Sequence, residues 1–222
     1  MMYLEVSHAT KRIGPDEVLK DVTFSLEKGT ICSLIGSNGA GKSMLMKAIC
    51  GLILLTDGSV AVDGKVIGRD ISFPPNLGAM IERPGLVPQD TGWQNLRELA
   101  LIRGRIGDPE IEDAMKRTGI YDAANKKFRK YSMGMKQRLG IAAAIMEKPD
   151  LLILDEPFNA LDEDGCHMVH QIIHEENERG ALIILAGHEA EDLESVSDIV
   201  LMMKNGQVTD RRILNRNQDK TN

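Results

Sequence analysis

The chain has few of the features that mark secreted, metal-binding or membrane-spanning proteins. Its 222 residues include three cysteines, Cys32, Cys50 and Cys166, which are too few and too scattered for a disulfide framework or a zinc site. No stretch approaches the roughly 18 uninterrupted apolar residues of a membrane-spanning helix. The first residues, MMYLEVSHATKR, also lack the apolar stretch of a signal peptide. We therefore expect a cytoplasmic protein whose cysteines are small, buried thiols.

An excess of basic charge is missing as well. Twenty-seven Lys and Arg residues stand against 33 Asp and Glu residues, so the formal net charge is −6. No basic run dominates, and bulk charge therefore does not favour a nucleic acid as a partner. With 42% hydrophobic and 27% charged residues, the composition is that of a globular protein. The length suits one domain with room for an inserted subdomain.

Hydrophobic periodicity divides the chain into regions. The first part is β-rich: VTFSLE alternates apolar and polar residues, TICSLIG is a buried run, and an Asp-Gly pair in SVAVDGKVI predicts a hairpin. In the middle, NLRELALIRGRI and KQRLGIAAAIME have apolar residues at helical spacing. Later, the strand-like LLILD and ALIILAG alternate with helical segments, and an Asn-Gly turn closes a last hairpin.

This order predicts a single α/β domain over the whole chain. Its parts are a core with a β-rich subdomain at 1–82 and 148–210, an inserted helical subdomain at 83–147, and a polar tail at 211–222 that we expect to be frayed.

The segment GSNGAGKS matches the phosphate-binding loop pattern completely. It follows the strand-like ICSLI and precedes the helix-like SMLMKAIC, which is the context that the mechanism requires. Lys42 is placed to reach the β- and γ-phosphates, and the Ser43 hydroxyl to ligate Mg²⁺. Backbone N–H groups and a helix N-terminus complete the cradle. The predicted nucleotide contacts are Gly36, Ser37, Asn38, Gly39, Ala40, Gly41, Lys42, Ser43 and Met44.

Two acidic residues follow the apolar run LLIL. A strand that is buried on both faces would place them at its carboxyl end, beside the phosphate-binding loop. Asp155 is expected to hold Mg²⁺, and Glu156 to accept a proton from an attacking water, which indicates hydrolysis rather than transfer. Taken alone, such a run is an ordinary strand end as often as a site. The phosphate-binding loop decides in favour of the functional interpretation.

His188 comes directly after the strand-like ALIILAG. The end of a strand that neighbours LLILD would bring this imidazole near the γ-phosphate, and a surface histidine is the alternative. A surface position is what we expect for the other histidines, which are His8, His167, His170 and His174.

The stretch YSMGMKQRLG contains a second Ser-x-Gly turn. Ser132 can cap a helix that starts near Met135, and Gly134 lets backbone N–H groups face outward. Because it has no lysine of its own, the turn is suited to completing a phosphate shell rather than forming one. An ordinary capped helix would explain these ten residues alone. Asp162, the last residue of the segment NALD, is expected to cap a helix, to lie in an interface loop, or both.

Taken in order, GSNGAGKS, YSMGMKQR, LLILDEP, NALD and a late Gly-His resemble the ATP-binding subunits of ABC transporters, from about Leu4 to Gly206. The resemblance implies a P-loop NTPase of the ABC ATPase type that uses ATP and Mg²⁺. It also implies a head-to-tail homodimer, or a pair of ABC subunits. In that arrangement Ser132, Gly134 and Asp162 act on the nucleotide of the other subunit, whereas Lys42, Glu156 and His188 act within their own.

Three positions depart from the family pattern. The usual signature Leu-Ser-Gly-Gly-Gln is Tyr-Ser-Met-Gly-Met here. An aromatic residue that stacks on adenine is usual near position 13, where this chain has Ile13, so we expect loose base selectivity. The glutamine expected after LGAMI aligns with Glu82 rather than with Gln89. A glutamate there can bind Mg²⁺ or the attacking water, and it predicts a steeper dependence on Mg²⁺.

The segments IERPGL, YSMGMKQRLGIA and DEPFNALD together resemble the bacitracin-exporter and lantibiotic-immunity branch. That resemblance implies an ATPase motor that drives a separate integral membrane permease and lies on the inner face of the cell membrane through it. A groove around residues 82–96 is expected to accept the permease, with Trp93 as an interface anchor or a core residue.

Two other functions are compatible with parts of this pattern. A soluble ABC-type ATPase without transport would use the same motifs, so a membrane partner is what distinguishes the two. A P-loop nucleotide kinase of similar length explains GSNGAGKS but leaves Glu156, His188 and the Ser132 turn without roles.

Overall fold

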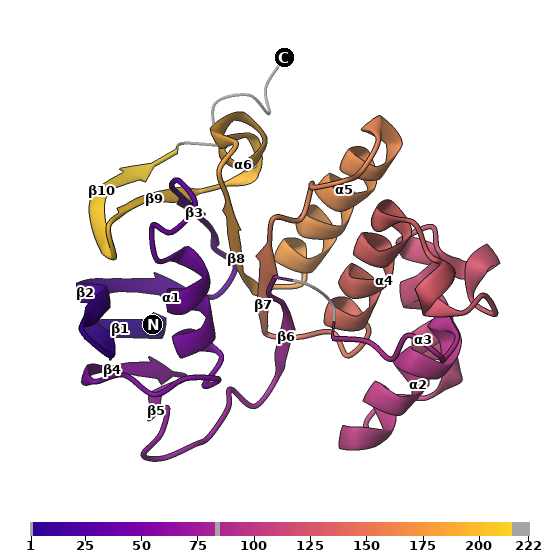
Figure 1. Ribbon diagram of the computed structural model, residues 1–222, viewed down its shortest axis with the longest axis horizontal. Helices are drawn as coiled ribbons and strands as arrows, with labels where there is room; N and C mark the ends of the chain where they lie inside the picture. The colour runs from indigo at the N-terminus through magenta and orange to yellow at the C-terminus, as the bar shows by residue number, and fades with distance from the viewer. Residues whose placement is uncertain (1, 83–84, 215–222) are drawn as a thin grey trace.

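The computed structural model describes residues 2–82 and 85–214, which form two β-sheets and the helices that pack against them (Figure 1). The larger sheet has the strand order β10-β9-β3-β8-β7-β6, and its neighbours are parallel except for the β9–β10 hairpin. Its strands are β3 (Ile31–Ile35), β6 (Leu77–Met80), β7 (Leu151–Asp155), β8 (Leu182–Gly187), β9 (Ile199–Lys204) and β10 (Gln207–Ile213).

The three central strands of this sheet are buried along their whole length. Every residue of β3, β7 and β8 is buried, because helices cover both faces of a parallel sheet. The covering helices are α1 (Lys42–Ile49), α5 (Glu163–Glu178) and α6 (Ala190–Val196). Since parallel strands end at the same edge, the segments that follow β3, β7 and β8 converge there.

The second sheet is antiparallel, with the order β2-β1-β4-β5. It consists of β1 (Met2–Ile13), β2 (Asp16–Glu27), β4 (Asp57–Val62) and β5 (Lys65–Val66). Its apolar face shares one hydrophobic cluster with α1 and with one face of β3, β7 and β8. The β-rich front and the parallel sheet are therefore parts of one core.

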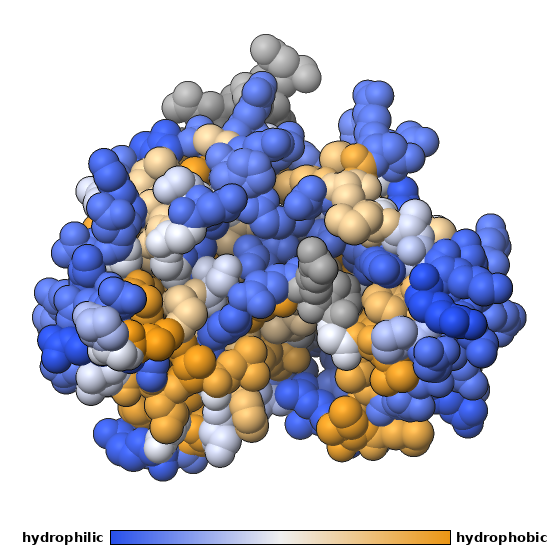
Figure 2. Space-filling view, viewed as in Figure 1, coloured by the Kyte–Doolittle hydropathy of each residue, from blue (hydrophilic) through white to orange (hydrophobic). Residues whose placement is uncertain are grey.

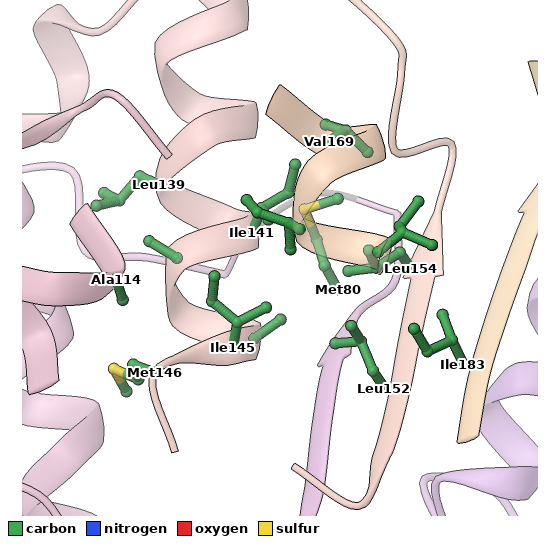
Figure 3. Close-up of a cluster of buried hydrophobic side chains, with 14 of the residues drawn as sticks. Met80, Ala114, Leu139, Ile141, Ile145, Met146, Leu152, Leu154, Val169 and Ile183 are labelled. Carbon is green, nitrogen blue, oxygen red and sulfur yellow. The ribbon is translucent and has the colours of Figure 1, made fainter. Parts of the chain in front are cut away.

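The helices between residues 92 and 145 cover the other side of the parallel sheet. They are α2 (Gly92–Arg103), α3 (Asp108–Arg117) and α4 (Met133–Ile145), with two short 3₁₀ turns at Tyr121–Ala123 and Phe128–Lys130. Ile141 and Ile145 of α4 belong to the same cluster as Leu152 and Leu154 of β7 and Met80 of β6 (Figure 3). This packing fixes the start of α4 relative to the end of β7.

Some local expectations need adjustment. Helix α4 begins at Met133, two residues earlier than expected. The tail expected to fray from residue 211 starts with residues that are paired in β10 up to Ile213, and residues 215–222 lie outside the described part of the chain. Trp93 is half-buried and packs against the helical core, which favours its core role. Within the described residues, none of the helices is long and apolar enough to cross a membrane.

An ion-pair network joins the helical region to the core. The Arg117 guanidinium of α3 lies 2.8 Å from a carboxylate oxygen of Glu175 and 2.8 Å from one of Glu176, both on α5. Glu176 also pairs with Arg179 at 2.7 Å, and its side chain is only 3% exposed. A buried carboxylate is tolerated only when it is paired, so Arg117 stabilises the contact between α3 and α5.

We expect Arg117→Ala to lower the free energy of unfolding by about 2 kcal/mol, because the buried Glu176 carboxylate keeps only part of its pairing. For a chain of this size the melting temperature should fall by roughly 4–8 °C. Thermal denaturation followed by circular dichroism measures this. Arg97→Ala is the control, since that exposed guanidinium lies 3.8 Å from an exposed carboxylate. Equal melting temperatures for the two variants would contradict the role of Arg117.

Candidate functional site

An open cavity of about 670 Å³ lies at the carboxyl ends of β3 and β7, the two strands that flank β8. Its walls combine residues that the sequence analysis singled out with others that it did not. The lining residues are Glu17, Val18, Lys20, Asn38, Gly39, Ala40, Gly41, Lys42, Ser43, Met44, Glu82, Asp155, Glu156, Asn205 and Gly206. The cavity thus has a floor made by the phosphate-binding loop and acidic residues on one side.

The phosphate-binding loop is held tightly by its surroundings. Gly41 has a φ of +104° at the position that caps α1, and a Cβ at Gly36 would lie 2.3 Å from the carbonyl oxygen of Met203. Both positions therefore require glycine. The Lys42 ammonium donates to the carbonyl oxygens of Gly36 at 2.6 Å and Ser37 at 3.3 Å, and its side chain is nearly buried. Gly36 and Ser37 thus position the lysine, and neither is part of the cavity wall.

Oxygen atoms gather beside the loop. The Ser43 hydroxyl donates to Asp155 Oδ2 at 3.0 Å, which links the start of α1 to the end of β7. Burial raises the pKa of the Asp155 carboxyl, partly offset by the hydrogen bonds from Ser43 and from the backbone N–H of Glu82. A hydroxyl and a carboxylate at this spacing are hard oxygen ligands, so they fit Mg²⁺.

Glu82 takes a different position from the one expected for a metal ligand. Its backbone N–H lies 3.4 Å from Asp155 Oδ2, whereas its carboxylate pairs with Lys47 of α1 at 2.5 Å. The Glu82 side chain is 59% exposed. The negative charge that this residue adds to the cavity is therefore balanced by Lys47. Its role as a ligand for Mg²⁺ stays a prediction.

Glu156 lines the cavity, whereas His188 does not and instead lines a neighbouring pocket that shares Glu156. The His188 imidazole Nδ1 is 2.9 Å and 3.1 Å from the two carboxylate oxygens of Glu156. Strand pairing between β7 and β8 brings them together, since the Glu156 backbone N–H donates to the Ala186 carbonyl at 2.8 Å. Glu156 also has a φ of +50°, which is a strained conformation for a residue other than glycine. The hydrogen bond and the charge of Glu156 raise the pKa of His188.

The other histidines are arranged largely as expected. His8, His167 and His174 have exposed side chains. His170 is the exception, because it is half-buried with its ring centroid 4.9 Å from that of Phe158.

The Ser132 turn does not line this cavity. Ser132 caps α4 by accepting a hydrogen bond from the N–H of Met135 at 3.2 Å, and neither Ser132 nor Gly134 is among the lining residues. Asp162 caps α5 through the N–H of Gly165 at 3.0 Å, and that hydrogen bond lowers its pKa. The capping roles are confirmed for both residues. Their predicted contacts with a nucleotide need a second chain.

Five cavity residues carry no prediction from the sequence, namely Glu17, Val18, Lys20, Asn205 and Gly206. Val18 and Lys20 of β2 reach the loop because the N–H of Lys20 donates to the carbonyl of Gly206, whose own N–H donates to the carbonyl of Ala40. Asn205 and Gly206 had been assigned only to a turn. Ile13, where the family has an aromatic residue, is 51% exposed and does not line the cavity. The wall nearest to β2 is therefore aliphatic and charged rather than aromatic.

A pH prediction follows from the Glu156–His188 pair. The raised pKa means that the imidazolium pairs with Glu156. This small stabilisation is fully present below the ordinary pKa of 6.5 and is lost as the pH rises through the raised value. In Glu156→Gln, the pKa of His188 should fall back toward 6.5, as measured by an NMR titration of the imidazole. An unchanged His188 pKa would show that Glu156 does not control it.

Comparison with known proteins agrees with this geometry. The family model described as ABC transporter matches residues 19–159, well over half of the chain. An uncharacterised ABC transporter ATP-binding protein of Bacillus subtilis, YybJ, is 46% identical to this chain. The match covers 92% of this chain and 94% of YybJ. The bacitracin transport ATP-binding protein BcrA of Enterococcus faecalis is 37% identical over 93% of this chain and 68% of its own. The lantibiotic transport ATP-binding protein SrtF of Streptococcus pyogenes is 32% identical over 92% of this chain and 88% of its own length.

Solved structures have the same fold. The ATP-binding subunit of an ABC transporter superposes with a TM-score of 0.87 at 29% identity, over 96% of this chain and 90% of that one. A dimeric ATP-binding cassette in a post-hydrolysis state with ADP and Pi has a TM-score of 0.85 at 23% identity. The superposition covers 95% of this chain and 98% of that one. The family match and the identity to its members identify the chain: it belongs to the ABC transporter family, as an ATP-binding subunit of the ABC ATPase type that hydrolyses ATP.

Proposed function

We propose that this chain is the motor subunit of an exporter for peptide antibiotics or lantibiotic-type compounds, driving a separate membrane permease. The motor role is supported by the separation of the predicted nucleotide contacts into two places on the chain. Lys42, Ser43, Asp155 and Glu156 surround one cavity, whereas the Ser132 turn points elsewhere on the same chain. A site divided in this way is complete only when a second subunit supplies the turn. The substrate class is supported by the names of two relatives, for bacitracin transport and lantibiotic transport.

Within one subunit, each residue has a distinct role. The Lys42 ammonium and the N-terminus of α1 bind the β- and γ-phosphates. Ser43 and Asp155 would hold Mg²⁺, which would neutralise part of the negative charge of the phosphates. Glu156 accepts a proton from the attacking water, and His188 keeps its carboxylate oriented through the contacts at 2.9 Å and 3.1 Å.

Across the dimer, Ser132 and Gly134 contribute backbone and hydroxyl donors to the γ-phosphate held by the other subunit. The exposed position of Ser132 at the N-terminus of α4 supports this role, because a helix N-terminus favours an anion. Asp162 lies beside the same face, where it accepts from Arg138 at 3.2 Å. Binding of MgATP between two subunits would then close the dimer, and hydrolysis would reopen it.

We expect Glu156→Gln to bind nucleotide normally and to lower the rate of ATP hydrolysis by at least ~100-fold, since general base catalysis contributes that much. The variant should accumulate as an ATP-bound dimer, visible by light scattering after gel filtration in MgATP. Glu163→Gln, in the exposed first turn of α5, is the control and should hydrolyse ATP like the parent. Parental hydrolysis by Glu156→Gln would mean that another group is the base.

The groove around residues 82–96 stays a prediction for the permease contact, since residues 83–84 lie outside the described part of the chain, and two exposed apolar groups elsewhere support docking as well. Leu52, Leu54 and Phe73 belong to the core side, with exposures of 59%, 61% and 56%. Leu101 and Ile102 end α2 on the helical side, with exposures of 71% and 78%. Figure 2 shows apolar surface along the lower edge of the molecule, below the strands and at the end of α2. Apolar side chains that are this exposed on both the core side and the helical side fit a partner that contacts both, as expected for a permease.

A pull-down tests this partner. Tagged Glu156→Gln, incubated with detergent-solubilised membranes of its own organism and MgATP, should recover a multi-span membrane protein in about equal amounts. Adding Leu101→Glu and Ile102→Glu should abolish that recovery, because two charges on an apolar interface are costly to bury. In an otherwise parental chain, the same pair should leave basal ATP hydrolysis unchanged.

Other outcomes of the pull-down are equally informative. Recovery of the soluble homodimer alone, or of a soluble partner, would instead support a non-transport ABC ATPase with a regulatory or assembly role. Deletion of the gene for this chain should then leave sensitivity to peptide antibiotics unchanged, whereas the exporter proposal requires that sensitivity to rise.

A further inference from the structure

A glutamine in α4 contacts the backbone of the proposed catalytic base. Gln137 Nε2 lies 2.8 Å from the carbonyl oxygen of Glu156 and 3.2 Å from that of Pro157. Carbonyl oxygens only accept, so the two hydrogens of the Gln137 amide must face them. The side chain therefore links two successive peptide groups at the point where the chain leaves β7.

Neighbouring contacts run along the same loop. A Cβ at Gly134 would lie 2.8 Å from the carbonyl oxygen of Ala160, so the helix backbone approaches the loop closely there. One turn further, the Arg138 guanidinium donates to Asp162 at 3.2 Å and to the Thr118 carbonyl at 3.1 Å. The first two turns of α4 and the loop at 156–162 thus form one packed unit.

The Glu156 backbone needs such support. Its φ of +50° is unfavourable for a residue with a Cβ, and such conformations persist only where the surroundings over-determine them. On one side, the Glu156 N–H is held by the Ala186 carbonyl of β8 at 2.8 Å. On the other side, the Glu156 carbonyl is held by Gln137. Losing the second contact leaves the residue free to rotate about the first.

We propose that Gln137 is a positioning residue for Glu156: its amide fixes the strained peptide that aims the carboxylate into the nucleotide cavity and at His188. The inference rests on the proposed role of Glu156 as the base. Because Gln137 lies five residues after Ser132 on the same helix, it also ties the Ser132 turn to the base within one subunit.

The test compares two substitutions at position 137 with a matched control. Gln137→Met keeps the length of the side chain but removes both donors, and Gln137→Glu places a carboxylate against two carbonyl oxygens. We expect kcat for ATP to fall about tenfold in Gln137→Met and further in Gln137→Glu, with KM within about twofold of the parent, since misplacing a reacting group costs rate rather than binding. Gln171→Met is the control, because Gln171 bonds Glu175 on the exposed side of α5.

A double-variant cycle separates positioning from a general loss of structure. In the Glu156→Gln background, measured over long incubations, Gln137→Met should cause no further loss, because the group that it positions is already gone. An equal loss in both backgrounds, or a rise in KM that matches the fall in kcat, would overturn the inference. If Glu156→Gln alone retained parental hydrolysis, the assignment of the base would fail instead. The two failures are therefore distinguishable.

Discussion

The burial of strand β7 is the constraint on which the site depends. Four apolar residues fix Leu151–Asp155 between β6 and β8, so the chain can leave the sheet only at its carboxyl edge. Asp155 then meets Ser43 at the start of α1, and Glu156 meets His188 at the end of β8. Three elements that are distant in sequence converge because one strand cannot shift its register without exposing its apolar side chains. The positive φ of Glu156 is a consequence of turning away from this strand at once.

Charge balance gives the cavity its second constraint. Asp155, Glu156 and Glu82 bring three carboxylates to a site that must also accept the negative phosphates of ATP. Lys42 and the N-terminus of α1 offset part of this charge, and Lys47 neutralises Glu82 at 2.5 Å. The buried Asp155 has a raised pKa, which reflects the cost of its charge. Ser43 and Asp155 would hold a divalent cation, whose charge would offset that cost. The pairing with Lys47 also explains how a glutamate is accommodated where the family has a glutamine.

Local sequence could predict the parts of the site that are fixed by local geometry. The phosphate-binding loop, the strand end at Asp155 and the caps at Ser132 and Asp162 each depend on a few consecutive residues, and the structure has them there. Val18, Lys20 and Gly206 could not be found in this way, since they reach the cavity through hydrogen bonds between β2 and the β9–β10 turn. The pairing of residues 211–213 was missed for the same reason, because β9 supplies the partner strand. Gln137 carried no local signal either, as it is an ordinary polar residue within a helix.

Helix α4 has two roles that follow from its geometry. Ser132 is exposed at its N-terminus, while Gln137, five residues later, is half-buried against the loop that follows Glu156. A helix rises about 1.5 Å per residue and bends little over one or two turns, so a shift of the exposed end moves the buried one. In the proposed dimer, the exposed end contacts the nucleotide of the other subunit, and the buried end holds the base of its own. The helix therefore connects the nucleotide contact made at its exposed end to the backbone of its own subunit's base, which Gln137 already holds in the single chain.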